Sequence, residues 1–354
     1  LKKNIENLWW RQFVDSREDM YGIDSAILMN SKVWEASGHV SGFSDPLVEC
    51  NKCKKRFRAD HLDNQKKCPE CSGELGEARQ FNMMFKTHVG ATEDESAVTY
   101  LRPETAQGMF VNFKNIIDSY HPKLPFGIAQ IGKVFRNEIA PRDFIFRVRE
   151  LEIMELEYFV EEKHWQELFD YWKDEIQKWF ASLGFEKGDI REVELDEAGR
   201  AHYSKRTVDF HFNYPGGFDE IGGLAYRTDF DITRHIEKSG VDLNYLDSIT
   251  NERLTPHVLE PTFGLGRHVL AVLTKAYTED ELGGEKRNFL KLPVNLAPIK
   301  AAIFPLLKNK PELVAKAREV FAMIKKEIPQ IVFDDNGNIG KRYRRQDEIG
   351  TPFC

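Results

Sequence analysis

The segment from Phe135 to Glu155, FRNEIAPRDFIFRVRELEIME, constrains the fold of this chain more than any other. From Phe144 to Val160, residues alternate at period 2, as in a β-strand that packs one face on a core. The preceding stretch 128–137 has the pattern of a second strand, and the turn formers at 140–143 predict a loop. We therefore predict two neighbouring strands joined by a short loop.

Charged side chains lie at fixed offsets on these predicted strands. The apolar face of the second strand carries Met154, Leu156, Tyr158 and Val160. The opposite face carries Arg147, Leu151 and Glu155, separated by about 13 Å per four-residue step. That separation suits a ligand with an anion near its middle and an amine at one end. For any single charge, a hairpin with a solvated face is the alternative.

The joint pattern resembles the second signature motif of class II aminoacyl-tRNA synthetases. The matching residues are Phe135, Arg136, Glu138, Arg147 and Glu155. The resemblance implies that Arg136 holds the α-phosphate of ATP, Glu138 the adenine edge and Arg147 the outer phosphates. Leu151 stands where the family usually has phenylalanine, so we expect a loss of aromatic stacking worth about 0.5–1.5 kcal/mol.

A second stretch, Glu260 to Arg267 (EPTFGLGR), resembles the third class II motif. Its two glycines allow close backbone approach at a helix start, where free N–H groups favour phosphate, and Arg267 adds a planar cation. The apolar period of 268–276 predicts the helix that follows. Alone the pattern is compatible with an ordinary helix start, but it follows the first motif in the family's order.

Further segments resemble the glycyl-tRNA synthetase family of the dimeric type. They are 33–39 (VWEASGH), 100–108 (YLRPETAQG), 223–232 (GLAYRTDFDI) and 260–261 (EP). Glycine has no side chain, so a selective site must hold its ammonium group and leave no volume for a methyl group. Glu104, Glu155 and Glu260 stand where the family places its acidic pocket. Glu104 is also compatible with an idle acid in the first turn of a helix after Pro103.

The resemblance implies two sets of site residues. The glycine site would comprise Arg58, Glu104, Leu151, Glu152, Ile153, Met154, Glu155, Glu260, Pro261, Thr262, Phe263 and Gly264. The ATP site would comprise Arg136, Asn137, Glu138, Phe146, Arg147, Val148, Arg149, Glu150, Leu151, Glu220, Ile221, Gly264, Leu265, Gly266 and Arg267. Thr262 replaces the expected serine, keeping the hydroxyl and adding a methyl group. Catalysis would rest on Arg136, Arg147, Arg267 and a Mg²⁺ ion on Glu220.

The implied reaction joins glycine to tRNA(Gly) through glycyl-adenylate and releases AMP and pyrophosphate. It needs no covalent nucleophile on the protein. Two alternatives stay open. One is a sister class II synthetase, such as the threonyl, prolyl or histidyl enzyme. The other is a catalytically silent synthetase-like protein that binds RNA or an adenylate.

The cysteines give an independent prediction. Cys50-x-x-Cys53 and Cys68-x-x-Cys71 have the spacing of a tetrahedral Zn²⁺ site without an open position, which indicates a structural ion. Disulfides are the alternative. Five cysteines in 354 residues, with neither a signal peptide nor a membrane-length apolar run, favour a cytoplasmic protein in which disulfides are rare.

We predict an α+β, α/β multidomain chain. Residues 1–288 would form a class II catalytic core with a mainly antiparallel sheet flanked by helices, 48–76 a zinc-ribbon insertion, and 289–354 a partial α/β anticodon-binding domain. Apolar periods predict helices at 165–183 and 311–328 and a strand at 301–304. The family resemblance implies a homodimer through 31–45.

The net charge of −7 excludes nonspecific nucleic-acid coating, so we expect no DNA or membrane partner. Any tRNA contact must come from local basic surface. The segment 341–345 (KRYRR) is the clearest candidate, and a solvated helix face or loop is the alternative.

Overall fold

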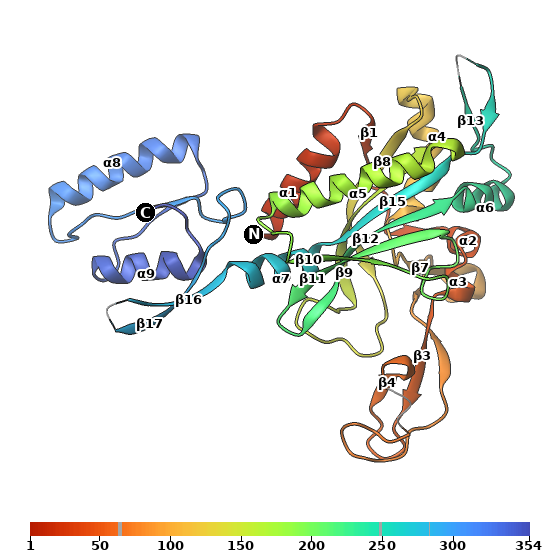
Figure 1. The fold of residues 1–354 in the computed structure, drawn as a ribbon, viewed down its shortest axis with the longest axis horizontal. Coiled ribbons are helices and arrows are strands. Elements are labelled where there is room, and N and C mark those ends of the chain that lie inside the picture. The colour runs from red at the N-terminus through yellow and green to blue at the C-terminus, as the bar shows by residue number, and fades with distance from the viewer. Residues whose placement is uncertain (63–65, 248–249, 283) are drawn as a thin grey trace.

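The structure is a computed structural model that describes residues 1–62, 66–247, 250–282 and 284–354. Its centre is a seven-stranded sheet in the order β1-β8-β9-β15-β12-β11-β10 (Figure 1). The strands are β1 Met20–Gly22, β8 Phe126–Phe135, β9 Glu150–Val160, β10 Ile190–Glu194, β11 Arg206–Tyr214, β12 Gly217–Thr228 and β15 His257–Gly264. Only the β1–β8 pair in this sheet is parallel, which confirms the prediction of a mainly antiparallel sheet.

The predicted second strand is shorter than its apolar period suggested. β9 begins at Glu150, so the prediction that the strand begins at Phe144 was wrong. Asp143 and Phe144 have positive φ angles of 57° and 56°, and this left-handed pair cannot continue an extended chain. A turn closed by the Arg142–Arg147 bridge therefore occupies the start of the predicted strand. The first strand is confirmed but runs from Phe126 to Phe135, two residues earlier than predicted, and the predicted loop 140–143 lies between the two strands.

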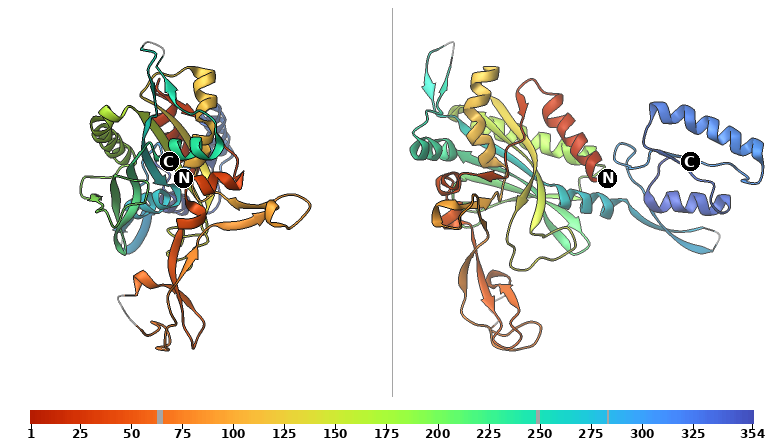
Figure 2. Two further views of the ribbon diagram at one scale, coloured as in Figure 1. Left: turned by 90° about the vertical axis from the view of Figure 1, so that its right-hand side faces the viewer. Right: turned by 180° about the vertical axis from the view of Figure 1, so that it is seen from behind.

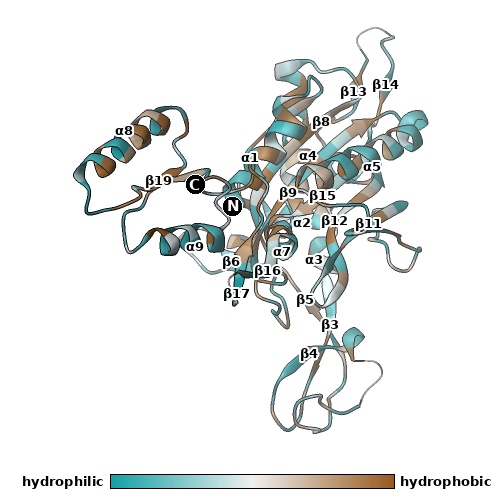
Figure 3. Cartoon of the chain, turned by 60° about the vertical axis from the view of Figure 1, so that its left-hand side comes forward, coloured by the Kyte–Doolittle hydropathy of each residue, from teal (hydrophilic) through white to brown (hydrophobic). Residues whose placement is uncertain are grey.

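One face of the sheet packs against three helices, α1 (Lys2–Trp10), α5 (Trp165–Ser182) and α7 (Leu265–Ala276). The helix predicted at 165–183 is confirmed by α5. Gly184, with a φ angle of +87°, ends it. Its buried side chains repeat at helical spacing and are Phe169, Trp172, Ile176, Trp179 and Phe180. The four apolar β9 residues predicted to face a core all join this cluster. Figure 3 shows the apolar residues concentrated along β8, β9 and β15.

The opposite face is covered only in part. Helices α4 (Ala106–Tyr120) and α6 (Phe230–Ser239) pack against the ends of β8, β9 and β15 in a second apolar cluster. Nearby lie the short helices α2 (Ser31–Ala36) and α3 (His39–Gly42) and a small sheet of β2 (Leu28–Met29), β7 (Val98–Leu101) and β6 (Phe85–His88). Two acids of β9, Glu155 and Glu157, point toward this partly covered face.

An insertion projects away from the core (Figures 1 and 2). Its strands are β3 (Ser44–Glu49), β4 (Arg56–Arg58) and β5 (Arg79–Asn82), in the order β4-β3-β5. It contains all four predicted zinc ligands. Residues 63–65 of the predicted insertion 48–76 lie outside the described residues.

The C-terminal part is a separate small α/β unit (Figure 1). A hairpin of β16 (Tyr277–Leu282) and β17 (Glu285–Leu290) leads to β18 (Ala301–Ile303), α8 (Pro311–Glu327), β19 (Ile331–Phe333) and α9 (Ile339–Ile349). The strand predicted at 301–304 and the helix predicted at 311–328 are confirmed. The predicted domain boundary after residue 288 falls inside β17. Across the described ranges, no helix is long and apolar enough to cross a membrane.

The basic segment 341–345 lies on α9, but its cations are not equivalent. Arg342 is only 1% exposed and donates to the carbonyl oxygens of Pro305, Asp335 and Gly337. Arg342 is therefore a structural residue, which limits any nucleic-acid surface on α9 to its neighbours.

Candidate active site

The first group of predicted site residues lies just beyond the end of β8. Arg136 follows the last strand residue and donates from Nε to the carbonyl oxygen of Pro103 at 3.0 Å. Arg147 lies 3.4 Å from Glu138 through its Nη1 atom, while its buried Nε has no hydrogen-bond partner in the described chain. The guanidinium of Arg149 is tied to the Glu138 carbonyl oxygen at 3.1 Å. The turn after Asp143 thus brings Arg147 beside Glu138, although Arg147 is not part of the strand.

The second group forms where β15 passes into α7. Gly264 is the N-cap and Arg267 lies in the first helical turn, as the glycine-rich stretch predicted. Arg267 Nη1 lies 3.0 Å from the Glu220 carboxylate, and its guanidinium lies 4.4 Å from the centre of the Phe146 ring. A Cβ atom on Gly266 would lie 3.0 Å from the Ile145 carbonyl oxygen, so this close approach favours glycine.

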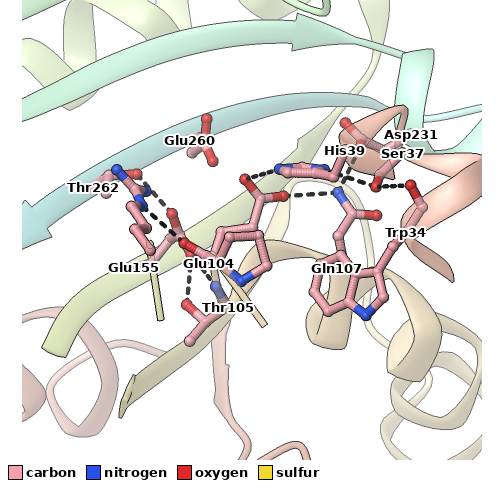
Figure 4. A network of polar contacts seen from close by, with 12 residues as sticks. Trp34, Ser37, His39, Glu104, Thr105, Gln107, Glu155, Asp231, Glu260 and Thr262 are labelled. Atoms are coloured by element: carbon pink, nitrogen blue, oxygen red, sulfur yellow. Dashed lines mark hydrogen bonds and ion pairs between the residues drawn. The ribbon is translucent and has the colours of Figure 1, made fainter. Parts of the chain in front are cut away.

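The third group is a buried set of acids on the partly covered face (Figure 4). Glu104, Glu155 and Glu260 are 6%, 2% and 6% exposed. Glu155 accepts hydrogen bonds from the Thr105 backbone N–H at 3.0 Å, from the Thr105 hydroxyl, and from the Thr262 hydroxyl at 3.0 Å. Burial raises the pKa of Glu155, and the negative charge of Glu104 acts in the same direction.

Glu104 is not an idle helix acid. α4 begins at Ala106, so Glu104 precedes the helix, and the first-turn interpretation is wrong. Its carboxylate lies 3.2 Å from His39 Nε2 and accepts a hydrogen bond from Gln107 at 2.9 Å. Burial alone raises the pKa of Glu104, but its interactions with the His39 ring and the Arg227 guanidinium outweigh burial and hold the pKa far below its ordinary value.

Sequence reasoning missed Arg227, the cation at the centre of this acidic group. Arg227 is 1% exposed and donates to Glu260 at 2.6 Å and to Asp231 at 2.7 and 2.9 Å. The β12–β15 register shifts between Tyr226 and Thr228, and Thr228 has φ 59°, so a bulge directs Arg227 into the site. The available signal in the sequence was Asp231, an acid four residues after Arg227, which could have indicated an ion pair there.

The contiguous ranges predicted as site residues do not all face the site, because alternate strand residues point to opposite faces. On β9, Glu152 pairs with Lys2 and Met154 joins the helix-covered core. On β15, Phe263 lies in that same core, whereas Thr262 faces Glu155. The side chains of Glu152, Met154 and Phe263 therefore do not face a ligand on the acidic side, and predicting them as contacts there was wrong.

Three further predicted residues lie in the core or at the surface. Ile221 and Leu265 are fully buried in the core, and Glu150 pairs with Lys133 at the surface. Arg58 is paired with Asp45 and Asp60, both at 2.6 Å. The hydrogen bonds to Asp60 raise the pKa of Arg58, and the charges of Asp45 and Glu138 act in the same direction. No contact between Arg58 and the three buried acids occurs in the described ranges.

The four insertion cysteines converge on one point. The Sγ atoms of Cys50 and Cys71 are 3.5 Å apart, and those of Cys53 and Cys68 are 3.7 Å apart. All four Sγ atoms lie within 4.8 Å of one another. Four sulfurs at about 2.3 Å from a tetrahedral ion are separated by roughly 3.8 Å, so this donor set fits Zn²⁺.

Two stretches of the chain match known families. Residues 85–276 match the tRNA synthetase class II core domain (G, H, P, S and T), and residues 300–354 match the anticodon binding domain. A prolyl-tRNA synthetase of Giardia lamblia, solved in complex with prolyl-adenylate, shares the fold with a TM-score of 0.70. It is 18% identical, and the match covers 99% of this chain and 61% of that one. The molecule therefore consists of a class II tRNA synthetase core and an anticodon-binding domain.

Relatives matched across the whole chain narrow this class. Glycine–tRNA ligases of Thermobifida fusca and Caldanaerobacter subterraneus are 48% and 45% identical over 100% of this chain and 82% of their own lengths. The Treponema denticola glycine–tRNA ligase is 47% identical, with 80% of its length covered. The chain belongs to the glycine–tRNA ligase family.

Proposed function

We propose that this chain activates glycine with ATP and transfers it to tRNA(Gly). Membership in the glycine–tRNA ligase family supports the reaction, and it disfavours both the sister synthetases and a silent binding protein. The structural observation that carries the proposal is the convergence of Glu104, Glu155 and Glu260 around Arg227. A pocket with this charge and so little exposed surface suits a small ammonium-bearing substrate.

The acidic group would hold the glycine ammonium. Glu155 and Glu260 lie on neighbouring strands, and Thr262 fixes Glu155 with its hydroxyl. Gly223 and Ala225 are the partners of Thr262 and Glu260 on β12. Small side chains on that strand leave space for the substrate backbone, while the Thr262 methyl group narrows the pocket wall. A larger amino acid would have to displace these fixed side chains.

ATP would lie across the arginines at the strand ends. Arg136, Arg147 and Arg267 would bind its phosphates, where negative charge shifts during attack of the glycine carboxylate on the α-phosphorus. Arg136 and Arg267 both contribute positive charge at Glu220. Their fixed positions lower the barrier without a covalent intermediate on the protein. The tRNA 3′ end then attacks the carbonyl carbon of the adenylate and releases AMP.

The residues around Glu220 fit a Mg²⁺ ion. Glu220 and Asp209 are neighbouring acids, and the charge of Arg267 acts on both. Burial, together with the charge of Glu220, raises the pKa of Asp209 to about 7, so added positive charge would be favourable. Carboxylate oxygens are the donors that Mg²⁺ prefers, and a bound ion would neutralise phosphate charge. Glu220 would be its protein ligand.

The proposal also covers a zinc ion, the two domains and the tRNA contact. Cys50, Cys53, Cys68 and Cys71 would bind a structural Zn²⁺ ion in a ribbon at 48–76. We place the catalytic domain at 1–288 and the anticodon-binding domain at 289–354, which would contact tRNA. A homodimer through 31–45 remains a prediction from the family resemblance, and a cytoplasmic location remains a prediction from the cysteine content.

Amino-acid-dependent exchange of pyrophosphate into ATP tests this proposal. The chain is assayed with each standard amino acid in turn, with Mg²⁺ present. We expect exchange with glycine alone, and its loss in Glu260→Gln, because that variant removes a charge facing the ammonium. The exposed variant Glu167→Gln on α5 is the matched control. Exchange with a different amino acid, or none with any, would refute glycine activation.

A further inference from the structure

Glu157 is a buried acid that none of the proposed steps uses. It lies on β9, two residues beyond Glu155 and therefore on the same face of the sheet. Its side chain is 0% exposed. Both of its carboxyl oxygens lack a hydrogen-bond partner in the described part of the chain. A carboxyl group in this state needs either a ligand or a proton.

The strand register places Glu157 directly against the glycine site. Leu259 pairs with Tyr158 and Thr262 pairs with Glu155, so Glu260 lies opposite Glu157 across the β9–β15 pair. One oxygen of Glu157 lies within 4.8 Å of an oxygen of Glu155 and of Glu260. Like charges directly opposite in a sheet repel each other, and burial strengthens the repulsion. Three ionised carboxylates at this spacing are therefore strongly disfavoured.

The hydrogen bonds around the three acids indicate which one carries a proton. Glu155 accepts three hydrogen bonds, from two groups of Thr105 and from Thr262. Glu260 accepts one from the Arg227 guanidinium at 2.6 Å. Donors of this kind stabilise an ionised carboxylate, whereas Glu157 has none. A proton is thus held most favourably on Glu157.

We propose that Glu157, buried behind the glycine site, remains uncharged and so keeps Glu155 and Glu260 ionised for the substrate ammonium. This inference rests on the function proposed above. The charged or titratable groups that act on Glu157 are Glu260, Arg227, Glu155 and Asp231. Burial raises the pKa of Glu157 well above its ordinary value, and the charge of Glu260 adds to the effect. The single nearby arginine does not offset them.

Glutamine substitutions test the charge state of each acid, because glutamine is an uncharged isostere. We expect Glu157→Gln to change the glycine KM in pyrophosphate exchange at pH 7.5 by less than about twofold. Glu155→Gln and Glu260→Gln should raise that KM by at least about 30-fold, because each removes a charge that holds the ammonium. Glu167→Gln is the exposed control.

Infrared difference spectroscopy, comparing the wild-type protein with each variant, detects the proton on the carboxyl group directly. The wild-type protein should show the carbonyl stretch of a protonated carboxyl group at pH 7.5, and Glu157→Gln should lack it. The band should persist in Asp209→Asn, which removes a more distant acid whose pKa is raised to about 7. If Glu157→Gln does not fold, absence of the band from the wild-type spectrum still overturns the inference, and its presence is assigned by its persistence in Glu155→Gln and Glu260→Gln, which remove the two neighbouring acids with raised pKa values.

The outcomes separate this inference from the proposed function. Wild-type protein without glycine-dependent exchange would overturn the function. An active wild type, combined with a large rise of the glycine KM in Glu157→Gln, would overturn only the neutral state of Glu157. Absence of the carbonyl band from both wild-type and Asp209→Asn spectra would overturn it as well.

Discussion

Removal of the Arg227 charge should destabilise the core more than removal of any surface arginine. In Arg227→Met, Asp231 and Glu260 lose their shared cation while remaining buried. Arg227 is 1% exposed, and its guanidinium also lies 3.7 Å from the centre of the Tyr203 ring. Loss of one partner from a buried ion pair costs about 3–5 kcal/mol. We therefore expect the free energy of unfolding to fall by about 4 kcal/mol.

A matched control lies one helix away. Arg234 on α6 pairs with Glu237 at 3.0 Å, and both side chains are more than half exposed. Arg234→Met should cost less than about 1 kcal/mol, because water screens the pair. Urea denaturation at pH 7.5, followed by tryptophan fluorescence, compares the variants. The fully buried Trp9, Trp172 and Trp179 lie in the helix-covered core and report its unfolding.

The double variant Arg227→Met/Asp231→Asn isolates the cause of the loss. When Asp231 is uncharged, loss of Arg227 leaves only the Glu260 charge buried without its cation, instead of two charges. The double variant should therefore be more stable than the sum of the single effects by about 1–3 kcal/mol. Additive effects, or a loss in Arg227→Met of less than about 1 kcal/mol, would refute the assignment of Arg227 as the essential counter-charge.

Three further predictions use other parts of the chain. Burial lowers the pKa of His268 to about 4, so the free energy of unfolding should fall by about 3 kcal/mol as pH drops from 6.5 toward 4. Urea unfolding midpoints measured over this pH range should decline less in His268→Gln than in the wild type. Cys71→Ser should lose its bound zinc by atomic absorption, whereas Cys354→Ser retains about one ion per chain. Thr262→Val should raise the glycine KM about 10- to 100-fold through loss of a hydrogen bond to a charged acceptor, and Thr262→Ser should preserve it. Equal effects of the two Thr262 substitutions would exclude a role for the hydroxyl.

Features determined by local sequence could be predicted. The period of the β9 apolar residues, the glycine stop after α5 and the glycine-rich start of α7 depend on near neighbours in the chain. The cysteine spacing likewise identified four sulfurs that the structure brings together. The start of β9 could not be found in this way, because residues 144–149 alternate as a strand does while two left-handed residues turn the chain.

The centre of the site depended on contacts between distant segments. Arg227 lies beside Glu260 because a bulge shifts the β12–β15 register, and its sequence context does not display that bulge. Glu157 was obscured for a different reason. It alternates with apolar residues on β9, so periodicity alone did not distinguish a buried acid behind the pocket from one at its surface.

The sheet register explains how a glycine site can be both highly charged and small. Glu155, Thr262, Gly223 and Asp209 form one row across four strands, and Glu260 and Ala225 are neighbours in the adjacent row. Strand pairing fixes the distances within each row, so the acids cannot separate to admit a larger substrate without breaking the sheet. In the proposed glycine site, charge would select the ammonium, whereas the glycine and alanine of β12 would leave space for its backbone. Selectivity would then be a property of the rigid sheet, and we expect substitutions at Gly223 and Ala225 to impair glycine binding even though neither side chain carries a charge.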